Sequence, residues 1–310
     1  MHEHIARTMY YLSVHLLFAS IVASAAWALT SILRASATTK YWTWVATTLN
    51  FVLPLGALID KLWASHLTWA RPLGTIGDPV WNMTRGSTAV ILGVIWMTGA
   101  FSMLTRLISR IRRERREAQV LATPSDCGRT SGFLADGIPV SFGDKHRSPA
   151  VRGVLYPRIL LPIGIERLLN RRELHAVLIH ELAHARRHDN LIRLLHEVSL
   201  CALWFHPLMW LTGAKIDLYR ELSCDESVIR RALGKDLVSA LAKLAVPNQT
   251  GVLQATASSH LSYRLARLST PPQTTYRVAS LLSVSLFAAV IAAGIFQTIA
   301  HTACCFAIKH

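Results

Sequence analysis

Charged side chains are scarce in this sequence. Asp, Glu, Lys and Arg make up 16% of the 310 residues, whereas they make up about 25% of a soluble domain. Hydrophobic residues account for 52% of the chain, and the mean hydropathy is +0.33. This shortage of charge argues against an ordinary soluble protein and indicates a chain embedded in a lipid bilayer.

Acidic residues are the scarcer of the two charged classes. The sequence has 18 Asp and Glu against 33 Lys and Arg, which gives a net charge of +15. Excess basic charge is typical of proteins that bind nucleic acid or lie against the anionic inner face of a membrane. Because no basic patch is interleaved with aromatic residues, we expect no direct nucleic-acid binding and take the lipid bilayer as the anionic partner.

Cysteine is also rare, and its spacing excludes a disulfide framework. The number of cysteines is odd, the spacing is irregular, and no C-x-x-C pair occurs. The five residues are Cys127, Cys201, Cys224, Cys304 and Cys305.

Four apolar segments are predicted to be transmembrane helices, because a span needs about 20 mostly apolar residues. They cover residues 9–33, 43–58, 88–108 and 278–300. The second is short and contains Asn50 and Pro54. The first has an alternative interpretation as a signal peptide, since Ala23-Ser24-Ala25 resembles a cleavage site, but its apolar stretch exceeds the usual core of about 7–15 residues.

Basic residues set the predicted orientation of these spans. Six arginines crowd the end of the third span, and the positive-inside rule places that end in the cytoplasm. They are Arg106, Arg110, Arg112, Arg113, Arg115 and Arg116. The prediction is an N-terminal membrane region over residues 1–108, a cytoplasmic domain over 109–277, and a fourth span with a short extracytoplasmic tail over 278–310.

The cytoplasmic segment is predicted to contain a strand followed by a helix. Residues 151–161 are apolar and β-branched with Pro157 inside, which confines the strand to a sheet edge or a bulge. Such an edge could be structural only, or could bind an extended substrate by strand addition. Asn170 and Glu173 have the spacing of a capping box at the start of the helix.

The predicted helix contains the pattern H-E-x-x-H at residues 180–184. Because residues four apart share a helical face, His180 and His184 can reach one tetrahedral zinc ion at about 2.0–2.1 Å. Glu181 can face the remaining ligand position and accept a proton from the attacking water as general base. The pentapeptide alone also fits a polar surface turn, but the apolar helix, its capped start and a downstream acidic segment favour a metal site.

That acidic segment, residues 220–226, supplies candidates for the third protein ligand that a catalytic zinc site needs. Glu221 would complete a His₂Glu set. Asp225, four residues on and on the same face, could accept the free N–H of a ligand imidazole. Glu226 is a competing carboxylate, and Cys224 is a soft donor that we interpret as a packed residue. A solvated acidic turn is the alternative.

The apolar residues between the two motifs must not cross the bilayer if both motifs bind one metal. A crossing at residues 191–211 would leave Glu221 on the opposite side from His184. We therefore predict a membrane-associated helical hairpin near residues 191–213, folded back at His206-Pro207. The predicted fold class is a mainly α membrane protein with four transmembrane helices and a cytoplasmic α+β zincin-like metalloprotease domain.

Several stretches together resemble the BlaR/MecR family of membrane metallopeptidases. These are the segment from Ser148 to Pro162, H-E-L-A-H-A-R-R-H-D at 180–189, F-H-P-L-M-W at 205–210 and E-L-S-C-D-E-S-V at 221–228. The resemblance implies a zinc endopeptidase of the gluzincin type in the inner membrane of a bacterial-type cell. It maps His180, His184 and Glu221 to the ligands and Glu181 to the catalytic base.

The resemblance also implies a regulatory role. In this family a signal from outside the cell switches on the protease, which inactivates a cytoplasmic transcriptional repressor and thereby induces β-lactam resistance. The sensors carry a C-terminal penicillin-binding domain, whereas only residues 301–310 follow the last predicted span here. Direct β-lactam sensing is therefore not expected, and a separate sensor subunit, a homo-oligomer, the membrane itself or a truncated gene would explain the difference.

Two other functions compete with this interpretation. Membrane quality-control proteases of the HtpX or CAAX-prenyl-protease type share H-E-x-x-H and a later E-x-x-x-D, but Cys224 and the run Phe205-His206-Pro207 favour the BlaR-like group. A non-catalytic membrane signalling adaptor would have no need of Glu181 as a base.

Overall fold

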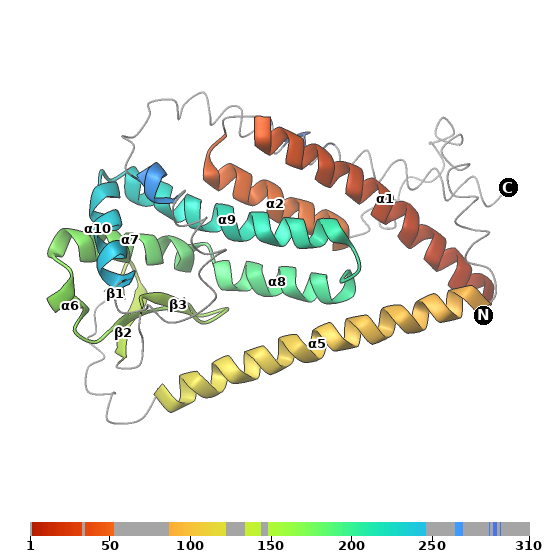
Figure 1. The fold of residues 1–310 in the computed structure, drawn as a ribbon, viewed down its shortest axis with the longest axis horizontal. Coiled ribbons are helices and arrows are strands. Elements are labelled where there is room, and N and C mark those ends of the chain that lie inside the picture. Colours follow the sequence, from red (N-terminus) through yellow and green to blue (C-terminus); the bar gives the residue numbers. More distant parts are fainter. Residues whose placement is uncertain are drawn as a thin grey trace. The chain divides into compact units, whose positions relative to one another are not determined.

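The computed structural model describes residues 2–32, 35–52, 87–121, 134–143, 148–245 and 264–268, with single residues at 285, 288, 289 and 292. The chain forms two compact units, and Figure 1 labels most of their elements. Unit 1 comprises Met1–Thr105, Val198–Ile216 and Arg277–His310, and unit 2 comprises Arg106–Glu197 and Asp217–Tyr276.

Unit 1 is helical in its described part. It contains α1 (His2–Ile32), α2 (Ala37–Val52), the first part of α5 (Ser87–Leu121), the end of α8 (Asp189–Ala202) and the start of α9 (Pro207–Ile229). Three buried alanines follow one stripe of α1, at Ala19, Ala23 and Ala26. Small residues allow helices to approach closely, and α2, which contacts α1, buries the large side chains of Tyr41 and Trp44.

Indole groups join α5 to the turn between α8 and α9. The Nε1 of Trp96 donates to the carbonyl oxygen of Ala202 at 2.8 Å, and the Nε1 of Trp204 donates to the carbonyl oxygen of Trp96 at 3.3 Å. A Cβ at Gly99 would lie 2.1 Å from the Trp204 ring. The glycine is therefore required for α5 to pack against this turn.

Two of the described helices are long and apolar enough to cross a membrane. They are His15–Ile32 within α1 and Val90–Glu114 within α5, and they overlap the first and third predicted spans. The second predicted span is described only to Val52, where α2 ends; residues 53–58 and nearly all of 278–300 lie outside the described residues. The four-span arrangement and its orientation stay a prediction.

Unit 2 contains a small sheet. Its strands are β1 (Leu134–Ala135), β2 (Ile138–Gly143), β3 (Ala150–Arg152) and β4 (Arg158–Pro162), in the order β1-β2-β4-β3. Strands β2 and β4 are parallel, and the other two pairs are antiparallel. The prediction of one continuous strand over 151–161 is wrong, because the chain reverses at Gly153, whose φ of +94° suits glycine but few other residues. Strand β3 lies at the sheet edge, but Pro157 belongs to neither strand, because it lies in the connection between β3 and β4.

The core of unit 2 lies between this sheet and the helices that follow it. Those helices are α6 (Ile165–Leu168), α7 (Arg171–Arg186) and α10 (Gly234–Ala245). Figure 1 shows α7 and α10 side by side near the sheet, and the two helices contact each other. Strand residues Ile159 and Leu161 pack with Val177 of α7 and Leu237 of α10, all at most 3% exposed.

The predicted capping box at the start of α7 is confirmed. The Asn170 side chain accepts from the Glu173 backbone N–H at 2.9 Å, and the Glu173 side chain accepts from the Asn170 N–H at 2.8 Å. Glu173 also accepts from Ser239 at 2.6 Å and Lys243 at 2.7 Å, both on α10. These bonds, first those from Lys243, lower the pKa of Glu173 from 4.5 to about 2.

Glu173 should therefore make stability depend on pH in the acid range. Because its pKa is depressed in the folded protein, its contribution is present above pH 4.5 and is lost as the pH falls toward about 2. We expect Glu173→Gln to unfold at a lower temperature than the unchanged protein at pH 7, with the difference shrinking as the pH falls below 4.5. Thermal unfolding of both proteins in one detergent measures this, and a gap independent of pH would contradict it.

Candidate metal centre

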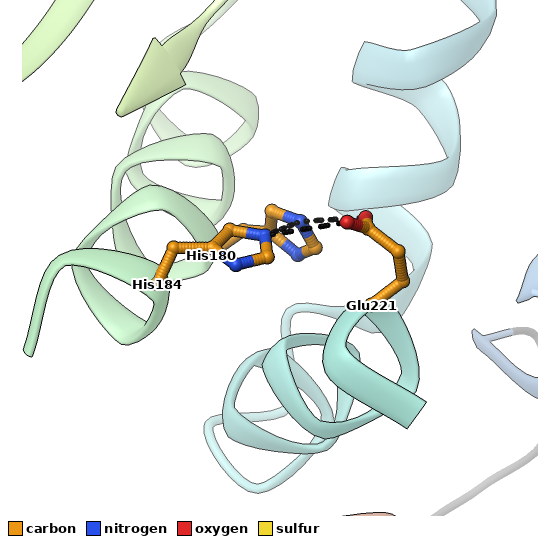
Figure 2. A group of neighbouring side chains, drawn as sticks. All are labelled: His180, His184 and Glu221. Atoms are coloured by element: carbon orange, nitrogen blue, oxygen red, sulfur yellow. Dashed lines mark hydrogen bonds and ion pairs between the residues drawn. The ribbon is translucent and has the colours of Figure 1, made fainter. Parts of the chain in front are cut away.

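Helices α7 and α9 bring together three side chains with metal-ligand chemistry. Figure 2 shows His180 and His184 projecting from α7 toward Glu221 on α9. The two Nε2 atoms are 3.2 Å apart. The Glu221 carboxylate lies 3.6 Å from Nε2 of His180 and 3.7 Å from Nε2 of His184. One donor atom from each residue thus converges on a single point.

A carboxylate lies on the far side of each imidazole ring. Oδ1 of Asp225 lies 3.1 Å from Nδ1 of His180, and Oδ2 of Asp189 lies 2.6 Å from Nδ1 of His184. An Nδ1–H held by a carboxylate leaves the lone pair on Nε2. Nε2 of each ring faces the shared point, which is the arrangement of metal-bound histidines that have carboxylate partners.

A break between α7 and α8 positions Asp189. His188 has a φ of +53°, which ends α7 and allows α8 to begin at Asp189. The Arg187 guanidinium donates to both oxygens of Asp189, at 3.0 and 2.6 Å. It also donates to the Arg220 carbonyl at 3.1 Å and to the Ser223 hydroxyl. Arg187 therefore connects the His184 side of the site to α9.

Arg264 plays the matching part on the other side of the site. It lies in a short helical segment at residues 264–268. Its Nε and Nη2 donate to the two oxygens of Asp225 at 2.8 and 2.9 Å, the bidentate geometry that a guanidinium favours. Its Nη1 lies 3.1 Å from the Glu221 carboxylate. One partly buried cation thus contacts both carboxylates that face His180.

The charges around the shared point favour a cation at that position. Burial lowers the pKa of His180, but the contacts with Asp225 and Glu221 outweigh it and raise the pKa to about 9. Burial raises the pKa of Glu221, yet His180, His184 and Arg264 hold it well below its usual value. Carboxylates that retain a proton on His180 so firmly also favour a metal cation in the same position.

The other residues singled out from the sequence have separate positions. Glu181 lies on α7 next to His180 and is half-buried. Glu226, the competing carboxylate, is buried and pairs with Arg267. Cys224 is fully buried, and burial raises the pKa of its thiol well above the usual value. A protonated thiol is a poor metal ligand, although Cys224 forms a second close group with His184 and Asp189.

Three residues of the site were not predicted from the sequence to contribute to the metal centre. Asp189 lies within the H-E-L-A-H-A-R-R-H-D run, but helical spacing from His184 does not bring it back to that side chain. Arg187 lies within the same run and has no pattern of its own. Arg264 is remote in sequence from both motifs, so its contact with Asp225 arises only from the tertiary fold.

The sequence is also similar to known proteins. Residues 11–268 match the family described as BlaR1 peptidase M56. A methicillin resistance mecR1 protein of Staphylococcus aureus is 23% identical over 176 residues, which cover 54% of this chain and 30% of that protein. The mecR1 protein of Staphylococcus epidermidis matches to the same extent.

A further relative is the regulatory protein BlaR1 of Bacillus licheniformis. It is 36% identical over 84 residues, which cover 27% of this chain and 14% of that protein. The matches thus span less than a third of the length of these curated relatives. The family match itself covers most of this sequence and includes both histidines of α7 and Glu221 of α9. The chain therefore belongs to the BlaR1 peptidase M56 family.

Proposed function

We propose that this protein is a membrane-bound zinc endopeptidase that cleaves a cytoplasmic protein. The observation that carries the proposal is the convergence of His180, His184 and Glu221. Two nitrogens that bind zinc at about 2.0–2.1 Å with tetrahedral angles are separated by about 3.3–3.4 Å. The observed Nε2–Nε2 distance is 3.2 Å, so the side chains fit a tetrahedral ion with little movement.

The donor set fits catalytic zinc better than structural zinc. Three protein ligands of the His₂Glu type leave a fourth position open, whereas structural sites are filled by four side chains. A bound zinc ion would acidify a water molecule and polarise a peptide carbonyl. Glu181, next to His180 and half-buried, would take up the proton of the attacking water and deliver it to the leaving amine.

The carboxylates behind the imidazoles would keep the site in its binding geometry. Asp189 accepts a hydrogen bond from Nδ1 of His184, and the Asp225 carboxylate lies 3.1 Å from Nδ1 of His180, so each histidine would offer the same nitrogen whether or not substrate is bound. Arg187 and Arg264 in turn hold these aspartates. Residues supported in this way lose little conformational entropy when the reaction begins.

The proposed location is the inner membrane of a bacterial-type cell, with unit 2 in the cytoplasm. Two apolar helices support membrane insertion. Arginines that follow the apolar part of α5, including Arg110 and Arg112, support a cytoplasmic position for its C-terminal end. The full proposal retains four spans, at residues 9–33, 43–58, 88–108 and 278–300.

The proposed substrate is a transcriptional repressor. Relatives of this chain carry the names methicillin resistance protein and regulatory protein, which supports a regulatory protease in resistance rather than a degradative one.

Metal analysis and substrate trapping test this function. The purified full chain should contain about one zinc ion, the stoichiometry of a three-ligand catalytic site, and a chelator should abolish cleavage until zinc is restored. The Glu181→Gln protein, expressed in its own cells, should retain an uncleaved DNA-binding repressor. A protein without bound zinc would refute the proposal, and trapping of misfolded membrane proteins instead would favour quality control.

Replacing Asp189 tests whether the carboxylate next to His184 contributes to zinc affinity. We expect Asp189→Asn to weaken zinc binding by about 10–100-fold, the usual effect of losing a carboxylate partner of a ligand histidine. Asparagine can present its N–H₂ to Nδ1 of His184, which would favour the wrong tautomer. Competition with a chelator measures the affinity. Glu166→Gln, an exposed carboxylate on α6, is the matched control, and equal affinities for the two variants would contradict the role of Asp189.

A further inference from the structure

The tip of the β3–β4 hairpin, residues 153–157, presents apolar side chains to the outside of unit 2. Leu155 is 64% exposed and Tyr156 is 85% exposed, while the neighbouring Val154 is 36% exposed. Single exposed apolar residues are common, but contiguous ones at a projecting tip indicate a surface that another phase or molecule covers.

The conformation of this tip is fixed by the fold. Gly153 has a φ of +94°, and a Cβ there would lie 2.2 Å from the Tyr156 carbonyl oxygen. The Asn190 side chain, at the start of α8, donates to the carbonyl oxygens of Val151 and Gly153 at 3.0 Å each. The apolar side chains are therefore held outward by backbone geometry and by two hydrogen bonds, and binding would cost little additional ordering.

Two arginines lie directly below the tip. Arg152 of β3 and Arg158 of β4 are partners in the antiparallel register, and like charges at directly opposite positions destabilise a sheet. Among the described residues, neither arginine has an ion-pair partner within 4.0 Å. An anion that bridged the two guanidinium groups would remove this repulsion.

We propose that the β3–β4 tip inserts into the headgroup region of an anionic phospholipid bilayer. A bilayer surface offers an apolar interface to the tip and lipid phosphates to the two arginines behind it. Leu155 and Tyr156 would enter the interface, where tyrosine is favoured. Arg152 and Arg158, one step back along the hairpin, would bind lipid phosphates. The tip thus acts as a peripheral anchor that orients unit 2 on the membrane.

Because unit 2 is attached to membrane helices, a tip of this size is sufficient to bind the bilayer. Two apolar side chains and two cations would bind vesicles weakly if unit 2 were free in solution. Helices that can cross a membrane belong to the same chain, so the bilayer is present at a high effective concentration. This inference rests on the proposed membrane location and does not depend on the proposed protease activity.

Depth measurement with the full chain tests the anchor. Cysteine is introduced as Leu155→Cys and labelled with an environment-sensitive fluorophore, after replacement of Cys127, Cys304 and Cys305 by serine; Cys201 and Cys224 are buried. The protein is reconstituted in vesicles of phosphatidylcholine and phosphatidylglycerol that contain nitroxide-labelled lipid. Matched labels at Lys235→Cys, exposed on α10, and at Val94→Cys, 60% exposed on α5, provide the two references.

If the tip inserts, the nitroxide lipid should quench the fluorophore at position 155 several-fold more strongly than the one at 235 and less strongly than the one at 94. Replacing both Arg152 and Arg158 with glutamine should reduce quenching at 155 toward its value in phosphatidylcholine alone. Equal quenching at 155 and 235 would overturn the anchor while leaving the protease intact, and protection of position 155 only by an added substrate peptide would assign the tip to substrate instead. Absence of quenching at 94 would overturn the membrane location and the anchor together.

Discussion

Replacing Glu181 with glutamine is expected to slow peptide-bond hydrolysis by about 10²–10⁴-fold, the contribution of a positioned general base, with no loss of zinc. Glutamine preserves the size of the side chain but does not accept a proton at neutral pH. Glu181 is not part of the converging group of His180, His184 and Glu221, so the metal should remain. Single-turnover cleavage of the trapped substrate and zinc per chain are the two measurements.

A ligand variant and a general-base variant are expected to lose different properties. His184→Ala should lose both zinc and cleavage, whereas Glu181→Gln should lose cleavage alone. Glu166→Gln, on the surface of unit 2, should lose neither. Undiminished cleavage by Glu181→Gln would remove Glu181 from the mechanism, and loss of zinc in that variant would make it a ligand rather than a base.

Most residues of the candidate site could be predicted from the spacing of residues along one helix. H-E-x-x-H needs only the helical repeat to bring two imidazoles onto one face, and the capping box at Asn170 fixed the start of that helix. Glu221 required a further step, because the chain had to fold back after α8 for a third ligand to reach the same side. These residues converge in the structure, while their role as zinc ligands stays a prediction.

Features set by unusual backbone or by tertiary contacts could not be predicted in the same way. Asp189 reaches His184 only because His188 adopts a positive φ, which helical spacing does not foresee. Gly153 reverses the chain within a segment whose apolar, β-branched pattern indicates a single strand. The pairing of Arg264 with Asp225 joins segments that have no pattern in common.

Replacing Glu221 with alanine should remove most of the bound zinc. We expect the affinity to fall by at least about 100-fold, more than the usual loss for a residue behind a ligand, because two effects add. One of three donors is deleted, and Nη1 of Arg264, which lies 3.1 Å from the Glu221 carboxylate, would face the imidazoles without its counter-charge. Zinc per chain after competition with a chelator measures the affinity.

A glutamine at the same position separates the two effects. Glu221→Gln retains an oxygen donor but not the negative charge, so it should bind zinc more tightly than Glu221→Ala and more weakly than the unchanged protein. Full zinc occupancy in Glu221→Ala would exclude Glu221 from the ligand set and direct attention to the neighbouring group of His184, Asp189 and Cys224. Cys224→Ser decides between the two groups, because it should preserve zinc if Glu221 is the ligand and lose it if the thiol is.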